Sequence, residues 1–236
     1  MGGLVYGGSG KLLDVYRPAL VSEPLPAVLL WHGRGPDERD VLAPLARAVA
    51  EFGVVVFVPD WCSDARDGGR THLRESAAFV RRNVVDLGGD PARIALAGWS
   101  LGGKSAVSAA LNPSVLDGWA PRAVVGIAGG CWTPAPTTGT APMDDLRGAV
   151  PTAPVVLVHG TADTVVDIQQ SRELRDALVE RGCVVSLEEV DSDHAGVVMT
   201  EYAPELGRCR PTVAEHAVRA GRRTAQLVAL AAGADD

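Results

Sequence analysis

Residues 94–102 read IALAGWSLG, an apolar run followed at once by a serine between two glycines. A small-residue helical pattern continues over 103–110. A strand, a sharp turn and a helix in this order form a nucleophile elbow, which lifts one serine hydroxyl above the edge of a sheet. Glycines at 98 and 102 suit such a turn because a side chain there would collide with the neighbouring strand or helix. Ser100 is therefore the leading candidate for a nucleophile.

The serine motif alone is a weak signal. The chain holds 27 glycines, so a serine with glycines at this spacing can arise by chance. A nucleophilic serine also needs a base that accepts its proton, a carboxylate that orients the base, and two N–H donors for the oxyanion. The chain supplies a candidate for each of these groups.

The composition predicts a single domain over residues 1–236. A chain of 236 residues with 47% hydrophobic side chains can bury one large core, and nothing requires a second one. The formal net charge of −7 argues against a nucleic acid or an anionic membrane surface as partner. A small neutral or cationic molecule fits this charge better. Nothing in the sequence indicates an oligomeric state.

Membrane and metal signals are missing from the sequence. No stretch approaches the roughly 18 uninterrupted apolar residues of a membrane span, and residues 1–10 lack the pattern of a signal peptide, so we expect a cytoplasmic protein. The four cysteines show neither CxxC pairing nor zinc-ligand spacing, and we expect buried free thiols. We expect no metal and no organic cofactor. The cysteines are Cys62, Cys131, Cys183 and Cys209.

Short apolar runs rich in valine and isoleucine alternate with longer amphipathic segments. Continuous apolar strands that alternate with helices predict an α/β fold, with a mostly parallel eight-stranded sheet covered by helices on both faces. Gly-Gly-Ser-Gly at 7–10 separates two early strands and predicts a hairpin at one edge. The expected strands are 4–6, 12–16, 27–31, 54–59, 94–97, 123–128, 155–159 and 184–190, and the expected helices are 39–52, 71–87, 103–111, 168–181 and 212–232.

The acid and the base are expected in the loops after the last two strands. Asp163 ends the string HGTAD and is well placed to meet a histidine from the next loop. Asp167 is the alternative, but it lies where a helix begins and suits an N-cap. His194 lies in a small polar loop after the last strand, and the order Ser100, Asp163, His194 is the one that the elbow fold requires. Structural roles are expected for the other histidines: His32, His72, His159 and His216.

The string HGRG, which begins at residue 32, ends the third strand. A glycine-bearing turn at this place can aim a backbone N–H toward the nucleophile. We therefore assign the oxyanion hole to the amides of Leu101 and Arg34, with Gly33 as a further contributor. The alternative is an ordinary turn between a strand and a helix.

The Arg34 side chain has two interpretations. A guanidinium at the mouth of a site can bind a substrate carboxylate in a bidentate manner. Alternatively, it points to solvent or pairs with a neighbour such as Asp37 or Asp40. The sequence leaves both open.

The chain resembles the α/β-hydrolase superfamily over essentially its whole length. The strings LDVYRP at 13–18, HGRG and GGDPARIALAGWSLGG at 88–103 are similar to the serine-esterase branch that includes carboxylesterases, feruloyl and acetylxylan esterases, and arylformamidases. HGTAD also resembles the acid position of dienelactone-hydrolase-like enzymes. Many of these esterases have HGGG where this chain has Arg34, and GxSAGG where it has Leu101. With Arg34 and Leu101 at these places, the oxyanion geometry and the acyl pocket can differ from those of the esterases.

Aromatic and sulfur-bearing residues beside the strand ends are candidates for the substrate pocket. Trp61, Trp132 and Met143 are expected on the catalytic rim, whereas Trp99, inside the elbow, suits the core better. The segment 131–154 is rich in proline and too short for a helical cap domain. We therefore expect an open site without a cap.

Together these features predict a serine carboxylic-ester hydrolase that acts through an acyl-enzyme on small, short-acyl esters. His194 would take the Ser100 proton, and Asp163 would hold the imidazole. The first alternative is an amide or thioester hydrolase such as an arylformamidase, because the same triad serves each bond. A second alternative, from another class, is a ligand-binding α/β-hydrolase homologue with slow turnover.

Overall fold

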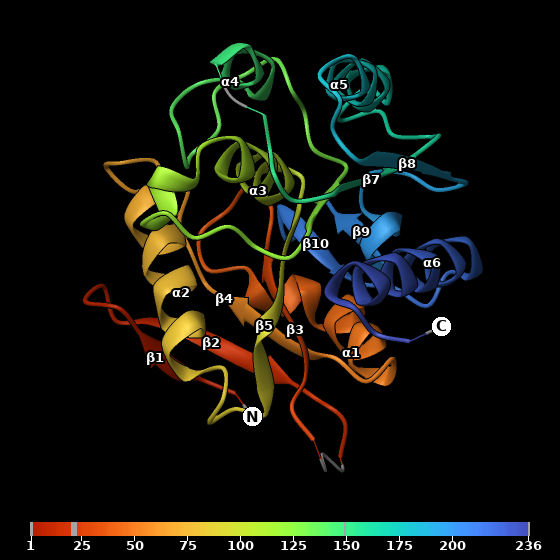
Figure 1. Cartoon of the computed structure of the whole chain (residues 1–236). Helices are drawn as coiled ribbons and strands as arrows, with labels where there is room; N and C mark the ends of the chain where they lie inside the picture. The colour runs from red at the N-terminus through yellow and green to blue at the C-terminus, as the bar shows by residue number, and fades with distance from the viewer. Residues whose placement is uncertain (1, 20–22, 149, 236) are drawn as a thin grey trace.

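A computed structural model describes residues 2–19, 23–148 and 150–235. Its centre is an eight-stranded sheet in the order β1-β2-β4-β3-β5-β6-β7-β8 (Figure 1). The pairs β1–β2 and β2–β4 are antiparallel and the other neighbours pair in parallel, which confirms the predicted fold class. The strands are β1 (Leu4–Tyr6), β2 (Lys11–Tyr16), β3 (Leu25–Trp31), β4 (Val55–Pro59), β5 (Gly89–Trp99), β6 (Val124–Ile127), β7 (Val155–Gly160) and β8 (Val185–Val190).

Helices cover both faces of this sheet. Helices α1 and α6 pack on one face, and α2, α3 and α5 pack on the other, with α4 beside α3 and α5 (Figure 1). Short 3-10 turns precede α1 and follow α3. The helices are α1 (Ala43–Glu51), α2 (Arg70–Asn83), α3 (Leu101–Leu111), α4 (Pro142–Gly148), α5 (Gln169–Glu180) and α6 (Glu215–Ala232).

Strands β3, β4 and β6 carry only apolar residues because both of their faces are buried. In β3, Val28 and Leu30 pack into the core under α1 and α6, whereas Leu29 and Trp31 pack into the core under α2 and α3. All four side chains are fully buried. A strand covered on one face only would alternate apolar and polar residues instead. The parallel pairing from β5 through β8 brings the carboxyl ends of β5, β7 and β8 to the same edge of the sheet.

A two-stranded antiparallel sheet after β8 was not predicted. It consists of β9 (Thr200–Ala203) and β10 (Arg208–Pro211), and Arg210 pairs with Glu201 across it at 2.9 Å. Because β10 occupies the chain up to residue 211, α6 begins at Glu215 and not at the expected residue 212.

Two further expectations concern the burial of the cysteine thiols and the presence of membrane-spanning helices. All four cysteines are free, but only Cys131 is buried, while Cys62, Cys183 and Cys209 are partly exposed. The expected burial therefore fails for three of them. Within the described ranges, no helix combines the length and the apolar character needed to cross a bilayer.

Candidate active site

Ser100 lies at the junction of β5 and α3 with a strained backbone, φ 55° and ψ −118°. The two glycines of the motif are required by close backbone contacts. A Cβ on Gly98 would lie 2.3 Å from the backbone of Gly102, and a Cβ on Gly102 would lie 2.3 Å from the carbonyl oxygen of His32. No side chain fits at such distances, so this turn needs glycine at both places.

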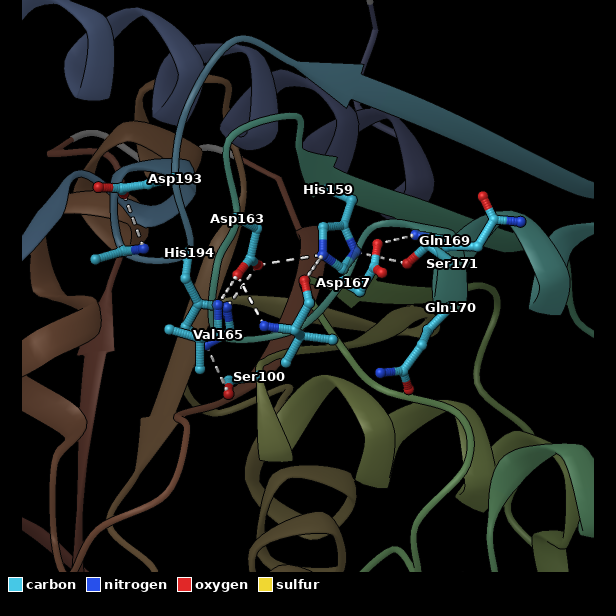
Figure 2. Close-up of polar contacts among 12 residues, drawn as sticks. Ser100, His159, Asp163, Val165, Asp167, Gln169, Gln170, Ser171, Asp193 and His194 are labelled. Atoms are coloured by element: carbon cyan, nitrogen blue, oxygen red, sulfur yellow. Dashed lines mark hydrogen bonds and ion pairs between the residues drawn. The ribbon is translucent and has the colours of Figure 1, made fainter.

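Three side chains from three loops form a hydrogen-bonded chain (Figure 2). Ser100 Oγ lies 2.9 Å from His194 Nε2, and His194 Nδ1 lies 2.7 Å from Asp163 Oδ2. Asp167 takes no part, because its Oδ1 accepts the backbone N–H of Gln169 at 2.9 Å at the start of α5. The arrangement places a base against the serine hydroxyl and a carboxylate against the base, which is the geometry of an activated nucleophile.

A second histidine also contacts Asp163. His159 Nε2 lies 3.1 Å from Asp163 Oδ2 and 2.9 Å from the carbonyl oxygen of Val166. Both neighbours of Nε2 are acceptors, so Nε2 carries the proton and Nδ1 accepts from the Ser171 hydroxyl at 2.6 Å. This second Ser–His pair is buried and lines no part of the cavity beside Ser100, so Ser100 stays the candidate nucleophile and His159 can position Asp163.

Both oxygens of the Asp163 carboxylate are held by donors. Besides the two histidines on Oδ2, the backbone N–H groups of Val165 and Val166 donate to Oδ1 at 2.8 and 2.9 Å. Burial by itself raises the pKa of Asp163, but the hydrogen bonds from His159 and His194 outweigh it and hold the pKa well below its usual value. Asp163 therefore stays ionised wherever the fold is intact and can balance an imidazolium at His194.

The loop that carries His194 is fixed from two sides. Trp99 Nε1 donates to the carbonyl oxygen of His194 at 2.8 Å, and the two rings lie 5.3 Å apart. Asp193 Oδ1 accepts the backbone N–H groups of Ala195 and Gly196 at 3.1 and 2.6 Å. Trp99 is buried, as expected, and it positions the base from within the elbow.

The predicted oxyanion donors lie next to Ser100. Leu101 begins α3, so its N–H has no acceptor in the helix, and the N–H of Arg34 likewise donates to no protein acceptor within the described part of the chain. Gly33 is packed against the elbow, since a Cβ there would lie 3.3 Å from the Ser100 Cβ and 3.0 Å from the Trp99 ring. Arg34, Leu101 and Ser100 line the same cavity, so these two N–H groups are the candidates for an oxyanion hole.

A cavity of about 330 Å³ opens beside Ser100. Trp132, Val165, Val166 and Leu101 form an apolar part of its wall, and Arg34 and Lys104 bring two positive charges. The remaining lining residues are Gly130, Thr133 and Gln170.

Two of the three predicted pocket residues lie elsewhere. The assignment of Trp61 is wrong: its side chain is fully buried, stacks on His32 and donates from Nε1 to the His32 carbonyl oxygen at 3.1 Å. Met143 lines a separate depression of about 190 Å³, against α4 and α5. Trp132 borders both cavities and is the one that lies beside Ser100. The chain turns inward after β4, so a tryptophan at that strand end enters the core.

The sequence-based prediction missed two residues near Ser100. Lys104 follows Ser100 by one helical turn, and a charged residue within a small apolar helix is the signal that could have identified it. His159 was assigned a structural role only, although it precedes Asp163 by four residues. Among the described residues, no three His, Cys, Asp or Glu side chains gather in a way that could hold a metal ion.

Solved esterase structures resemble this whole fold. A thermostable esterase from Pseudomonas putida ECU1011 matches 99% of this chain and 82% of its own, with a TM-score of 0.73 at 16% identity. Carboxyl esterase 2 from the fungus Tuber melanosporum matches 97% of this chain and 84% of its own, with a TM-score of 0.72 at 17% identity. The chain thus has the fold of these esterases, the α/β-hydrolase fold.

Part of the chain also matches a curated protein in sequence. Carboxylesterase NlhH of Mycobacterium tuberculosis is 40% identical over 110 residues, which are 43% of this chain and 34% of that protein. The match thus spans about a third of the length of that relative. No protein-family model matches the chain.

Proposed function

We propose that this chain is a serine carboxylic-ester hydrolase that works through an acyl-enzyme. His194 Nε2 takes the Ser100 proton as Oγ attacks the ester carbonyl carbon, and the N–H groups of Leu101 and Arg34 receive the oxyanion. The C–O bond then breaks and the alcohol leaves with the proton from His194. Water, activated by the same imidazole, releases the acid and restores the serine. Asp163 balances the positive charge of the imidazolium both when the acyl-enzyme forms and when water hydrolyses it.

The observation that carries this proposal is the contact of Ser100 Oγ with His194 Nε2 at 2.9 Å on the wall of an open cavity. Asp163 Oδ2, at 2.7 Å from Nδ1, orients the imidazole for proton transfer. The partial likeness to carboxylesterase NlhH supports an ester as the substrate class. No step needs a cofactor.

A small ester with a short acyl group fits the cavity best. Between β6 and β7, the described residues add only the helix α4, and the cavity of about 330 Å³ remains open to solvent. Long acyl chains would extend into water and gain little from burial. The alcohol part would lie at the open mouth.

Labelling and turnover test the proposal together. A fluorophosphonate should label the protein with one group per chain, and peptide mapping should place the group on Ser100. Steady-state turnover of a short-acyl aryl ester separates an enzyme from a ligand-binding homologue, because a receptor would be labelled without turning over. N-formyl-kynurenine and a thioester, run beside the ester, test the amide and thioester alternatives. Failure of Ser100 to label, or a faster rate on one of the alternative substrates, would overturn the proposal.

A further inference from the structure

Lys104 is a buried cation in the wall of the cavity beside Ser100. It is one of two lysines in the chain, lies one turn after Ser100 on α3 and is 9% exposed. Its Nζ donates to Thr133 Oγ1 and is 3.5 Å from the carbonyl oxygen of Pro134, both of them neutral oxygens. The other lysine, Lys11, pairs with Asp37 at 2.6 Å.

Arg34 brings a second cation to the same cavity. Its side chain is exposed, and the two acids considered as its partners are engaged elsewhere: Asp37 with Lys11, and Asp40 with Arg208 at 2.6 Å. Within the described chain, neither Arg34 nor Lys104 forms an ion pair. Burial, followed by the charge of Arg34, lowers the pKa of Lys104. The two side chains are therefore close enough to repel each other.

The acidic groups near the cavity form no ion pair with Arg34 or Lys104 among the described residues. Asp64 and Asp67 line an adjoining depression that also includes Arg34, but Asp67 accepts hydrogen bonds from Gly69 and Thr71 on α2. Glu173, on the other side, accepts from Trp132 Nε1 at 2.6 Å. An ammonium buried without a counter-charge is unfavourable, and a neighbouring like charge makes it more so. A bound anion would relieve both costs.

We propose that the substrate is an ester with a carboxylate on its acyl or alcohol part, and that Lys104 and Arg34 bind this carboxylate. This inference rests on the proposed esterase function and names the substrate class of the same site. The Arg34 guanidinium offers paired donors that match a carboxylate, and Lys104 adds a point charge in the wall of the same cavity. The apolar wall around Trp132 and Val165 then receives the uncharged part of the ester. The cavity thus attracts an anion although the whole chain carries a net charge of −7.

Two other roles for Lys104 must be distinguished from this one. Through Thr133 and Pro134 it fastens the loop after β6, and as a nearby charge it would favour the oxyanion on any ester. Both roles would act equally on charged and neutral substrates. Only binding of a substrate carboxylate makes the effect depend on substrate charge.

A matched pair of esters separates these roles. Monoethyl succinate and ethyl isocaproate have nearly the same shape, but only the first has a carboxylate, and meta-acetoxybenzoate with meta-isopropylphenyl acetate provides the same contrast on the alcohol side. Wild-type enzyme should prefer the anionic member of at least one pair. Lys104→Met should lower the ratio of kcat/KM, anionic over neutral, by about ten- to a hundredfold, as expected for a lost charge-assisted contact. Arg34→Gln should lower the ratio in the same direction, and Lys104→Arg should retain most of it.

The control is Arg82→Met, which removes an exposed positive charge from α2 and should leave the ratio unchanged. Equal losses on both members of each pair in Lys104→Met would overturn the inference while leaving the esterase proposal intact. Absence of turnover on every ester would overturn the esterase proposal alone, because calorimetry of succinate with the Ser100→Ala protein measures anion binding without turnover. In that calorimetry, the inference would be overturned if the Ser100→Ala protein bound no succinate. It would also be overturned if the Ser100→Ala/Lys104→Met double variant bound succinate equally well. Far-ultraviolet circular dichroism shows that each variant is folded.

Discussion

At the scale of single residues, the Asp163 carboxylate meets four donors and is buried, so it has little freedom to turn. His194 is held through its Nδ1 by this carboxylate and through its carbonyl oxygen by Trp99. The orientation of the base is thus determined by groups that do not touch the substrate. His159 belongs to this support because it donates to the same Asp163 oxygen that His194 uses.

Changing Asp163 to asparagine should affect catalysis, whereas changing Asp167 to asparagine should affect only stability. Asp163→Asn replaces the carboxylate that faces His194 Nδ1 with a neutral amide and should lower kcat about a thousandfold or more, because the imidazole loses its counter-charge and the tautomer that the carboxylate imposes. Asp167→Asn should cost at most about 1 kcal/mol of unfolding free energy through a weakened helix cap. Steady-state kinetics and urea unfolding measure the two effects. A large loss of kcat in Asp167→Asn alone would assign the acid role to Asp167 instead.

His32 should make the stability of the fold depend on pH. Its Nε2 accepts the backbone N–H groups of Glu38 and Trp61, and Nδ1 lies 3.0 Å from the carbonyl oxygen of Gly33. Burial lowers the pKa of His32 from 6.5 to about 4, because a charged imidazolium is unfavourable away from water. Between these values the unfolded chain binds the proton and the folded chain does not. Stability from this group is therefore full above the unfolded pKa and falls as the pH drops toward 4.

Urea unfolding at different pH values measures this effect. From about pH 7 to pH 5, His32 should remove roughly 2 kcal/mol of unfolding free energy, since one pKa unit corresponds to about 1.4 kcal/mol. His32→Gln should be less stable at neutral pH but should show a smaller change between the two pH values. The same pH dependence in His32→Gln and in wild type would assign the effect to other groups.

At the scale of elements, the strand–turn–helix unit around Ser100 could be predicted because its glycines, apolar run and small-residue helix are all local. The burial of both faces of the sheet could also be predicted, because the strands are continuous apolar runs. The β9–β10 hairpin could not be predicted, since residues 200–211 have neither a continuous apolar run nor a clear alternation, and Val213 and Leu206 are exposed. Its strands form through pairing with each other, which sequence periodicity does not reveal.

The candidate site also contains residues that the sequence could locate and residues that it could not. Ser100, Asp163 and His194 could be located because each follows a recognisable strand. Trp61 could not, because its position depends on the path of the chain after β4, where His32 and Trp61 stack. The charges in the cavity depend on which acids pair with which bases, and only the structure shows that Arg34 and Lys104 form no ion pair with an acid among the described residues.

The elbow itself should tolerate no side chain at Gly102. A Cβ there would lie 2.3 Å from the His32 carbonyl oxygen and 2.5 Å from that of Trp31, and both belong to the core of the sheet. Gly102→Ala should therefore lower the unfolding free energy by more than about 2 kcal/mol, as overpacking against backbone does. Gly148→Ala is the matched control, because nothing lies within 4 Å of a Cβ at that position. Equal stabilities of the two variants in urea unfolding would show that the turn is looser than described.

At the scale of the whole molecule, the open cavity sets the size of the substrate. With an aryl ester series, kcat/KM should peak at acyl groups of about two to six carbons, because each further methylene stays in water and forgoes roughly 0.8 kcal/mol of burial. The rate should not jump above the solubility limit of the substrate, because the described residues between β6 and β7 supply the helix α4 and no further element to act as a lid. A kcat/KM that continues to rise through acyl chains of twelve carbons, or a jump at the solubility limit, would show that the segment 131–154 closes over the substrate.

Turnover by the Ser100→Ala variant decides whether this serine is the nucleophile. The substitution removes one oxygen that points into the cavity, and its nearest polar partner is His194 Nε2 at 2.9 Å, so the core is left intact. With a short-acyl aryl ester, kcat should fall by about a thousandfold or more, while the urea unfolding curve stays close to that of the wild type. Retention of more than about a tenth of the wild-type kcat by this folded variant would contradict nucleophilic catalysis at Ser100.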